Sequence, residues 1–342
     1  MKHIIWLTPG FAADESDTKC IPPLQLLARQ LATQTDMQLH IISLHYPYKQ
    51  EKYQWFQTEV YPAYSSGPLS KIRTWWRAWT YIKLLLKKHP TAPLHSFWLN
   101  DAALLGQLAC RFFGIKHRIT LMGQDARPSN KYLKLFALSK LQLISLSPFH
   151  DDQLYASTGR RADKIIPWGI EKSAVQTAKT AENRAIDVLG VGNLIALKDY
   201  TTFLKIIAQI RPDYPNIKVV LIGDGVERGK LEQLAHQLNI SPNVSFTGYL
   251  DRKKVLAYMR KSKVFLHTSE YESFGYVFLE ALANGMQLVS RPVGIATAGK
   301  KWQVASKEEL FSATLAALES PSDNQPYLPY TMEDCMKSYL AL

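Results

Sequence analysis

The sequence alternates short runs of β-branched and other apolar residues with longer amphipathic stretches along nearly its whole length. Such alternation is typical of βαβ units that build a mostly parallel sheet. In the first half the predicted strands are Ile4–Leu7, Leu39–Ser43, Leu94–Trp98, Arg118–Leu121, Leu141–Leu146 and Lys164–Ile166. In the second half they are Ala185–Val191, Lys218–Ile222, Val244–Phe246, Val264–His267 and Gln287–Ser290. Helical periodicity indicates helices over Asp199–Ile210, Glu227–Leu238, Arg252–Lys261 and Phe274–Asn284. We therefore expect an α/β fold.

The chain length and one polar interval predict two domains. A length of 342 residues suits two domains, and 46% hydrophobic residues suffice to bury a core in each. The stretch from Gly169 to Asn183 is polar and lacks apolar periodicity, which is typical of a linker. We predict a first domain over 1–168, a linker over 169–184 and a second domain over 185–320. The tail over 321–342 is broken by prolines and ends in a short helix that can return to the first domain.

Positive charge is concentrated in the first half of the chain. Residues 1–170 hold 21 Lys and Arg against 11 Asp and Glu, whereas residues 171–342 hold 20 against 18. Such a field implies an anionic partner, which could be nucleic acid, an acidic membrane surface or a phosphorylated substrate. Charge alone does not distinguish among these three kinds of partner.

The sequence gives no sign of secretion or of a disulfide framework. Its apolar runs are far shorter than the roughly 18–20 residues that span a bilayer, and its first residues read as a strand rather than a signal peptide. Cys20, Cys110 and Cys335 lack zinc-binding spacing, so we expect reduced thiols. These features favour a cytoplasmic protein.

Several common active-site motifs are absent from the sequence. The run from Gly223 to Lys230 matches neither the dinucleotide-binding fingerprint nor a Walker A loop. No HExxH, paired i,i+4 histidines or Gly-x-Ser-x-Gly elbow occurs. No Asp-x-Asp pair is present to chelate a divalent ion. We therefore expect a site without metal and without a bound cofactor.

The densest functional signal runs from His267 to Gly285. A strand ends at His267, a loop carries Glu272, and Phe274-Gly275 opens a helix whose first backbone N–H groups have no helical partners. Such a helix start suits a diphosphate, and a glycine allows the anion to approach closely. The alternative is a solvated loop before an ordinary half-buried helix. Glu280 weakens that alternative, because it lies among apolar residues where an unpaired carboxylate is costly.

This motif resembles the donor-site signature of retaining GT-B glycosyltransferases, in particular those of family 4. Glu272 and Glu280 form Glu-x7-Glu, and Ala-x-Ala-x-Gly follows. Three earlier segments, 188–200, 220–225 and 244–250, resemble the family's donor-domain strands and turns in the same order. Four ordered matches over some ninety residues are far more specific than one spacing.

The resemblance implies two Rossmann-like doubly wound domains that face each other across a cleft. It also implies transfer of a sugar from a nucleoside-diphosphate sugar to a hydroxyl acceptor, with retention and without a covalent protein nucleophile. Lys198 would meet the diphosphate, Glu272 the donor sugar and Glu280 the ribose. The catalytic residues carried over are Lys198 and Glu272. The donor-binding residues carried over are Gly10, Asn193, Gly223, Gly248, Ser273, Phe274, Gly275 and Glu280.

The sequence departs from the family pattern at two places. Asn193 stands where the family usually has arginine, and Met122 stands where many relatives have histidine. Polar substitutes at the acceptor side are Gln124 and Asp125, at the carboxyl end of a predicted strand, and Ser96 and Trp98 end another predicted strand that faces the same cleft. A turn with an Asp helix cap accounts equally well for Gln124 and Asp125, and Trp98 suits a core position.

A tryptophan-rich amphipathic helix is expected over Leu69–Lys88. Tryptophan beside basic residues suits the interface of an anionic membrane, and the membrane-facing candidates are Arg73, Trp75, Trp76, Arg77, Lys83 and Lys87. The alternative packs the tryptophans on the sheet and leaves the basic residues solvated. A membrane contact would imply a lipid-linked acceptor and a peripheral location on the cytoplasmic face of the inner membrane.

The expected function is therefore a hexosyl- or glycosyltransferase of cell-surface glycan or glycolipid synthesis, with a glycan or lipid-linked acceptor. One alternative is a non-transferring GT-B relative, either a sugar-nucleotide epimerase or an inactive regulatory subunit. A basic nucleic-acid-binding protein is a weaker alternative, because its aromatic residues should stand on strands or loops rather than along one helix. We expect no nucleic-acid partner.

Overall fold

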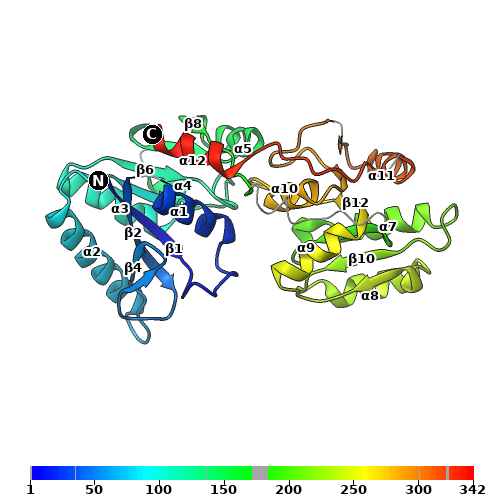
Figure 1. The fold of residues 1–342 in the computed structure, drawn as a ribbon, viewed down its shortest axis with the longest axis horizontal. Helices are drawn as coiled ribbons and strands as arrows, with labels where there is room; N and C mark the ends of the chain where they lie inside the picture. Colours follow the sequence, from blue (N-terminus) through cyan, green and yellow to red (C-terminus); the bar gives the residue numbers. More distant parts are fainter. Residues whose placement is uncertain (1, 35, 137, 172–183, 300, 321–322) are drawn as a thin grey trace. The chain divides into compact units, whose positions relative to one another are not determined.

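The computed structural model describes all residues except 1, 35, 137, 172–183, 300 and 321–322. The chain divides into two compact units, of which the first comprises Met1–Gly169 with Met332–Leu342 and the second Ile170–Thr331. Each unit is an α/β layer structure with its own sheet (Figure 1). Most of the predicted linker over 169–184 lies outside the described residues. Within the part that is described, no helix is long and apolar enough to cross a membrane.

The first unit surrounds an eight-stranded sheet of order β3-β4-β2-β1-β5-β6-β7-β8. Its strands are β1 Lys2–Gly10, β2 Met37–Tyr46, β3 Tyr53–Trp55, β4 Thr58–Pro62, β5 Leu94–Phe97, β6 His117–Thr120, β7 Gln142–Ser145 and β8 Lys164–Ile165. Its helices are α1 Pro22–Gln34, α2 Ser70–Lys88, α3 Asp101–Phe113, α4 Tyr132–Leu135, the 3-10 turn η1 Leu138–Lys140, α5 Pro148–Thr158 and α12 Met332–Leu340. All strand pairs are parallel except β3 with β4.

The small hairpin of β3 and β4 was not predicted from the sequence. Its two strands are three and five residues long and carry Gln, Thr and Glu, so they lack a strong apolar run. Its turn uses Phe56 at φ 46° instead of a glycine or asparagine. Without the usual turn residues, the segment has no local hairpin signal.

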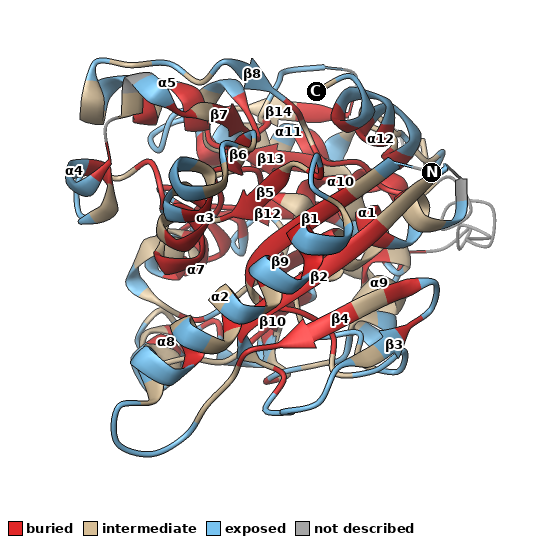
Figure 2. Cartoon of the chain, turned by 90° about the vertical axis from the view of Figure 1, so that its left-hand side faces the viewer, coloured by how far each residue is buried: buried red, intermediate tan, exposed pale blue. Residues whose placement is uncertain are grey.

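The central strands of the first unit are buried beneath its helices. Figure 2 turns this unit toward the viewer and shows β1, β2 and β5 largely in the colour of buried residues. One cluster of buried side chains joins Ile5, Leu94 and Ala102 with residues of α2, and a second one joins Leu121 and Leu143 with the α4 and α5 region. Burial on both faces explains the continuous apolar runs of these parallel strands.

The second unit surrounds a six-stranded, fully parallel sheet of order β11-β10-β9-β12-β13-β14. Its strands are β9 Ile186–Val191, β10 Val219–Ile222, β11 Val244–Phe246, β12 Ser262–His267, β13 Gln287–Ser290 and β14 Trp302–Val304. Its helical segments are η2 Ala196–Lys198, α7 Tyr200–Ile210, α8 Arg228–Gln237, η3 Ser241–Asn243, α9 Arg252–Arg260, α10 Tyr276–Ala283 and α11 Leu310–Glu319. Every strand and helix predicted for this half is present, with ends shifted by one or two residues. Strand β14 and helix α11 are additional.

Helix caps fix where several helices begin. The side chain of Asp199 accepts a hydrogen bond from the Thr202 backbone at the start of α7, and Asp251 does the same for Lys254 at the start of α9. Helix α7 buries Phe203 and Ile207 in the main apolar cluster of the second unit. The Asp199 cap and the core beneath α7 hold the loop at the carboxyl end of β9, where part of the candidate site lies.

The last helix, α12, belongs to the first unit. Its Tyr339 hydroxyl lies 3.1 Å from Oγ1 of Thr120 and accepts a hydrogen bond of 3.2 Å from Nε1 of Trp168. Its ring also lies 5.5 Å, centroid to centroid, from that of His95. The chain therefore leaves the first unit after Gly169 and re-enters it at Met332.

Candidate active site in the second unit

Lys198 and Glu272 form a largely buried ion pair at the carboxyl edge of the second sheet. Lys198 ends the η2 turn after β9, and its Nζ donates to Oε1 of Glu272 in the loop after β12. Their side chains are only 19% and 16% exposed. Strands β9 and β12 are neighbours in the sheet, which is why residues far apart in the sequence meet here.

His267 is a second partner of Glu272. The ring is buried, and its Nε2 lies 3.0 Å from Oε1 of the carboxylate. Burial works to raise the pKa of Glu272, but the hydrogen bond from His267 and the positive charge of Lys198 outweigh it and lower the pKa to about 2. Glu272 is therefore ionised at neutral pH.

Backbone contacts fasten the loop after β12 to the η2 turn. Thr268 donates its hydroxyl to the Lys198 carbonyl at 2.9 Å, and the Ser269 hydroxyl and Glu270 N–H donate to the Leu197 carbonyl at 3.1 and 2.9 Å. These hydrogen bonds hold the two charged residues, Lys198 and Glu272, at a fixed position relative to each other.

Gly275 leads into helix α10 in a left-handed conformation, with φ 82°. A Cβ at this position would lie 2.4 Å from the Phe278 ring, so only glycine fits. Phe274 is buried beside it, and its carbonyl accepts a 3.0 Å hydrogen bond from Ile295 N–H. Ser273 is half-buried in the same turn. The amides that open α10 thus follow Glu272 within a few residues.

Glu280 lies further along α10 and pairs with Arg252 at the start of α9. Arg252 Nε donates to Oε1 of Glu280 at 2.8 Å, and the glutamate side chain is 13% exposed. Burial raises the pKa of Glu280, and the charge and hydrogen bond of Arg252 oppose that rise. The arginine stabilises the ionised form, which is the form that accepts hydrogen bonds from hydroxyl groups.

Close backbone contacts join the loops after β9, β10 and β11. Gly223 N–H donates to the Gly248 carbonyl at 3.0 Å, and a Cβ on Gly223 would lie 1.9 Å from the Gly192 carbonyl oxygen. Gly248 has φ 71°. Exposed Asn193 accepts a 3.2 Å hydrogen bond from the Tyr249 hydroxyl. The predicted donor-binding residues of this unit therefore lie on adjacent loops at one edge of its sheet.

The predicted site residues of the first unit differ in how far they are buried. Gly10 is buried at the end of β1. Ser96 is fully buried, and its Oγ lies 2.8 Å from Nε2 of His117, so it faces helix α3 and not open space. Trp98 is half-buried with φ 69°, and Gln124 is exposed.

Asp125 has the cap-like role that was the alternative to acceptor binding. Its Oδ2 accepts hydrogen bonds from Leu99 N–H at 2.7 Å and Met122 N–H at 2.9 Å, and the residue is buried. Burial raises the pKa of Asp125 to about 7, with these two hydrogen bonds opposing the rise. The carboxyl group joins the loops after β5 and β6 and is turned away from solvent.

Helix α2 presents part of the predicted membrane-facing set to solvent. Trp76 is 69% exposed, and Arg73, Lys83 and Lys87 are exposed with it. Two members face the protein instead. Trp75 is half-buried with Nε1 3.5 Å from Oδ2 of Asp101, and Arg77 donates to the carbonyls of Tyr64 and Pro62 at 3.4 Å.

Arg252 and His267 are contributors to the site that the sequence did not single out for a role. Arg252 carries no local signal, because only the fold brings α9 beside α10. His267 stands at the end of a predicted strand, where a polar residue is a usable hint. A third residue, Arg291, lies with Nη1 3.6 Å from Oε1 of Glu270.

Comparison with known proteins finds similarity over the segment that holds this site. Residues 173–298 match the family model described as Glycosyl transferases group 1. The lipopolysaccharide core biosynthesis glycosyltransferase LpsE of Rhizobium meliloti (strain 1021) is 32% identical over 103 residues, which cover 30% of this chain and 28% of LpsE. The alpha-monoglucosyldiacylglycerol synthase of Acholeplasma laidlawii is 28% identical over 150 residues, or 43% of this chain and 34% of the synthase. The matched segment thus spans about a third of the length of these relatives.

Solved structures extend the likeness to the whole fold. Anabaena HepE, in complex with UDP and glucose, superposes with a TM-score of 0.67 over 100% of this chain and 98% of its own, at 17% identity. Residues 173–298 thus resemble the glycosyl transferases group 1, and the two parallel-sheet units have the architecture of GT-B glycosyltransferases.

Proposed function

We propose that this protein is a retaining, metal-independent glycosyltransferase of family 4 that takes its sugar from a nucleoside-diphosphate donor. The observation that carries the proposal is the Lys198–Glu272 pair beside the Gly275 turn, with Glu280 further along the same helix. A cation, a glycine-opened helix start and two carboxylates suit the diphosphate, sugar and ribose of one ligand.

In this proposal Lys198 stabilises the departing diphosphate. The negative charge that develops as the glycosidic bond breaks lies on the leaving phosphate, so a nearby cation and the first N–H groups of α10 lower the barrier. Lys198 is neutralised by Glu272 in the structure. An incoming diphosphate shares the lysine with Glu272, while that carboxylate accepts hydrogen bonds from sugar hydroxyls.

Glu280 takes the ribose hydroxyls in the same proposal, and Arg252 fixes its carboxylate. The acceptor hydroxyl attacks from the leaving-group face, so no protein side chain forms a covalent intermediate. Asn193, Gly223, Gly248, Ser273 and Phe274 line the donor from adjacent loops of the second unit, and Gly10 is a donor-binding candidate on the first unit. Trp98 and Gln124 are the acceptor-side candidates on that unit that retain exposed surface.

We further propose an acceptor on or near an anionic membrane, in cell-surface glycan or glycolipid synthesis on the cytoplasmic face of the inner membrane. Exposed Leu69, Ile72 and Trp76 form an apolar strip along α2, and Arg73, Lys83 and Lys87 flank it. Apolar side chains beside cations complement the acyl chains and phosphates of an acidic lipid surface. The matched relatives include proteins named for lipopolysaccharide core and glycolipid synthesis.

Donor binding tests the proposal directly. Isothermal titration with UDP, GDP and ADP, followed by donor-sugar hydrolysis, should identify one preferred nucleotide. Lys198→Ala and Glu280→Ala should each weaken binding of that nucleotide or turnover of its sugar tenfold or more, because a charge-assisted hydrogen bond is worth roughly 1.5–3 kcal/mol. Lys205→Ala, an exposed lysine on α7, is the matched control. Wild-type behaviour of both site variants would overturn the assignment, and binding without turnover would favour a non-transferring relative.

A further inference from the structure

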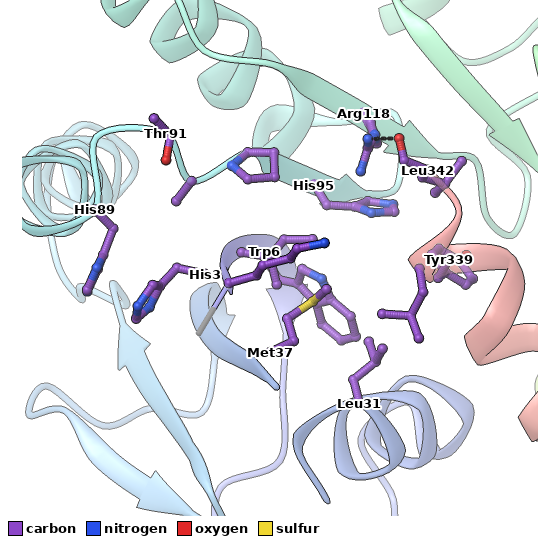
Figure 3. A pocket seen from close by; sticks show the side chains of 15 residues that line it. His3, Trp6, Leu31, Met37, His89, Thr91, His95, Arg118, Tyr339 and Leu342 are labelled. Atoms are coloured by element: carbon purple, nitrogen blue, oxygen red, sulfur yellow. Dashed lines mark hydrogen bonds between the residues drawn. The ribbon is translucent and has the colours of Figure 1, made fainter. Parts of the chain in front are cut away.

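Three histidines from separate elements of the first unit meet near the amino-terminal ends of β1 and β2. His3 lies on β1, His40 on β2, and His89 follows the last residue of α2. His3 and His89 also line a cavity of about 490 Å³ (Figure 3). The figure shows these two rings at one side of the cavity, away from the Arg118–Leu342 contact. The donor site described above lies in the other unit.

The ring nitrogens of the three histidines have metal-ligand spacing. His3 Nδ1 lies 3.2 Å from His40 Nε2, and one nitrogen from each of the three rings lies within 4.8 Å of the other two. Two nitrogens bound at about 2.0–2.1 Å to one tetrahedral zinc ion stand about 3.3 Å apart. The His3–His40 pair therefore already has the separation that a shared ion requires.

His89 completes the set from a connecting segment. Its ring stacks on that of His3 with centroids 3.5 Å apart, and it lies 5.3 Å from the His40 ring. Residue 89 caps α2 with φ −133° and ψ 73°, outside the helix itself. A turn of this side chain about its own bonds moves a nitrogen from the stack toward the His3–His40 pair.

A carboxylate lies near Nδ1 of the buried His40, the ring nitrogen that does not face His3. Many metal-bound histidines have such a partner at the nitrogen that does not bind the metal. Oε2 of Glu59, on β4, lies 3.6 Å from His40 Nδ1 and accepts the Tyr61 hydroxyl at 2.7 Å. His40 Nδ1 is buried and has no hydrogen-bond partner at normal distance among the described residues. With Nε2 on a metal, Nδ1–H would point at Glu59, which fixes the ring and offsets part of the ion's charge.

The three rings supply imidazole nitrogens as ligands. A neutral imidazole binds a metal through its unprotonated nitrogen. Imidazole ligands suit zinc and similar first-row transition metals better than calcium or magnesium.

We propose that His3, His40 and His89 bind one transition-metal ion, with zinc as the expected metal and the fourth position directed toward the cavity. The ion links β1, β2 and the segment after α2, so it acts as a clip within the first unit. This site is separate from the proposed donor site and does not depend on it. The sequence showed no metal motif because the three ligands come from distant positions.

The test uses the full chain without a polyhistidine tag. Protein stripped with a chelator is dialysed against zinc, and bound metal is counted by mass spectrometry; Co²⁺ then serves as a spectroscopic probe of tetrahedral nitrogen ligation. We expect one zinc ion per chain, visible absorption bands from bound Co²⁺, and a rise in Tm of about 5 °C at saturating zinc. Binding of the preferred nucleotide among UDP, GDP and ADP, measured with and without zinc, should be unchanged.

Single variants identify the ligands. His3→Ala and His89→Ala change partly exposed residues, so folding should survive, and each should lower zinc affinity at least tenfold. Glu59→Gln should lower it by roughly tenfold, in the range seen for partners behind a ligand. His236→Ala, an exposed histidine on α8, is the control and should keep one ion.

Two results would overturn the proposal. One is zinc uptake below one ion per chain in the wild-type protein under saturating conditions. The other is affinity that does not change in both His3→Ala and His89→Ala, because binding would then be adventitious. In either case the three histidines are an ordinary stacked and hydrogen-bonded cluster. A parallel loss of nucleotide binding in the Lys198→Ala variant would concern only the donor site.

Discussion

Nε of Arg252 lies 2.8 Å from Oε1 of Glu280, across the start of α9 and the middle of α10. The arginine opposes the rise in the pKa of Glu280 that burial of this carboxylate, which is 13% exposed, produces. Arg252 therefore affects the proposed ribose contact of Glu280, although it need not touch the donor itself.

Arg252→Ala should destabilise the second unit by about 1–3 kcal/mol. Loss of the arginine leaves Glu280 buried without its cation, and the cost is below that of a fully buried pair because Arg252 is 35% exposed. Urea unfolding measures the change. Lys253→Ala, on the exposed face of the same helix, should stay within about 0.5 kcal/mol of wild type. Equal stability of the two variants would show that the pair contributes nothing.

Gly223→Ala should disrupt the loops of the donor site. The added Cβ would lie 1.9 Å from the Gly192 carbonyl oxygen, and the residue has φ 140°, so backbone must move. Donor affinity should fall at least tenfold. Gly229→Ala is the matched control, because no atom lies within 4 Å of the added Cβ and the residue is inside α8. That control should gain about 0.5–1 kcal/mol of stability. Full donor affinity in Gly223→Ala would contradict the packing argument.

Stability of the second unit should fall as pH drops from about 4.5 toward 2. The pKa of Glu272 is lowered to about 2 in the folded protein, so its stabilising contribution is complete above its unfolded pKa and is lost as the pH falls through that window. The contribution is about 3 kcal/mol. Glu272→Gln should flatten this part of the stability profile, measured by urea unfolding at each pH. Glu308→Gln, an exposed change, should keep the wild-type slope; a wild-type slope in Glu272→Gln would refute the assignment.

Transfer should continue in excess EDTA. The proposed site stabilises the diphosphate with Lys198 and the start of α10, so no divalent ion is required for the leaving group. The rate of donor-sugar hydrolysis, measured before and after chelation, should be equal. Loss of activity restored by Mn²⁺ or Mg²⁺ would show a metal at the donor site. Zinc alone restoring activity would instead couple the histidine cluster to turnover.

Binding to liposomes should require acidic lipid and the exposed side of α2. Replacement of Arg73, Lys83 and Lys87 by serine should reduce binding, and Trp76→Ala should reduce it further. Binding should weaken with salt, because the Debye length falls from about 10 Å at 0.1 M to about 3 Å at 1 M. Trp76 fluorescence should shift to the blue on insertion.

The control for the membrane prediction removes the same charge elsewhere. Lys205, Lys230 and Lys253 are exposed on the second unit, and their triple serine variant should bind liposomes like wild type. Equal binding to neutral and acidic liposomes, or none to either, would assign the positive field to a soluble anionic acceptor.

The parallel-sheet architecture could be predicted from the sequence because buried parallel strands consist of continuous apolar runs. The strands from β9 to β13 were located to within a residue or two for this reason. The β3–β4 hairpin and β14 were missed, since Gln54, Glu59 and Gln303 interrupt the apolar pattern of these short strands.

The sequence anticipated which segments supply the candidate site, but not how their charges pair. Motif spacing pointed to Lys198, Glu272 and Glu280, yet it had no means of indicating that Arg252 would neutralise Glu280. The same limit applies to helix α2. Periodicity predicted an amphipathic helix, but only packing against α3 and the β4 region decides that Trp75 and Arg77 face inward while Trp76 faces solvent.

The return of α12 to the first unit has a consequence for synthesis on the ribosome. The complete second unit is translated before the segment that supplies Tyr339 to Thr120 and Trp168. The nascent first unit therefore lacks α12 at first. The apolar surface that α12 covers stays exposed until the second unit has been translated. A single cut in the chain therefore cannot separate the two units into intact pieces.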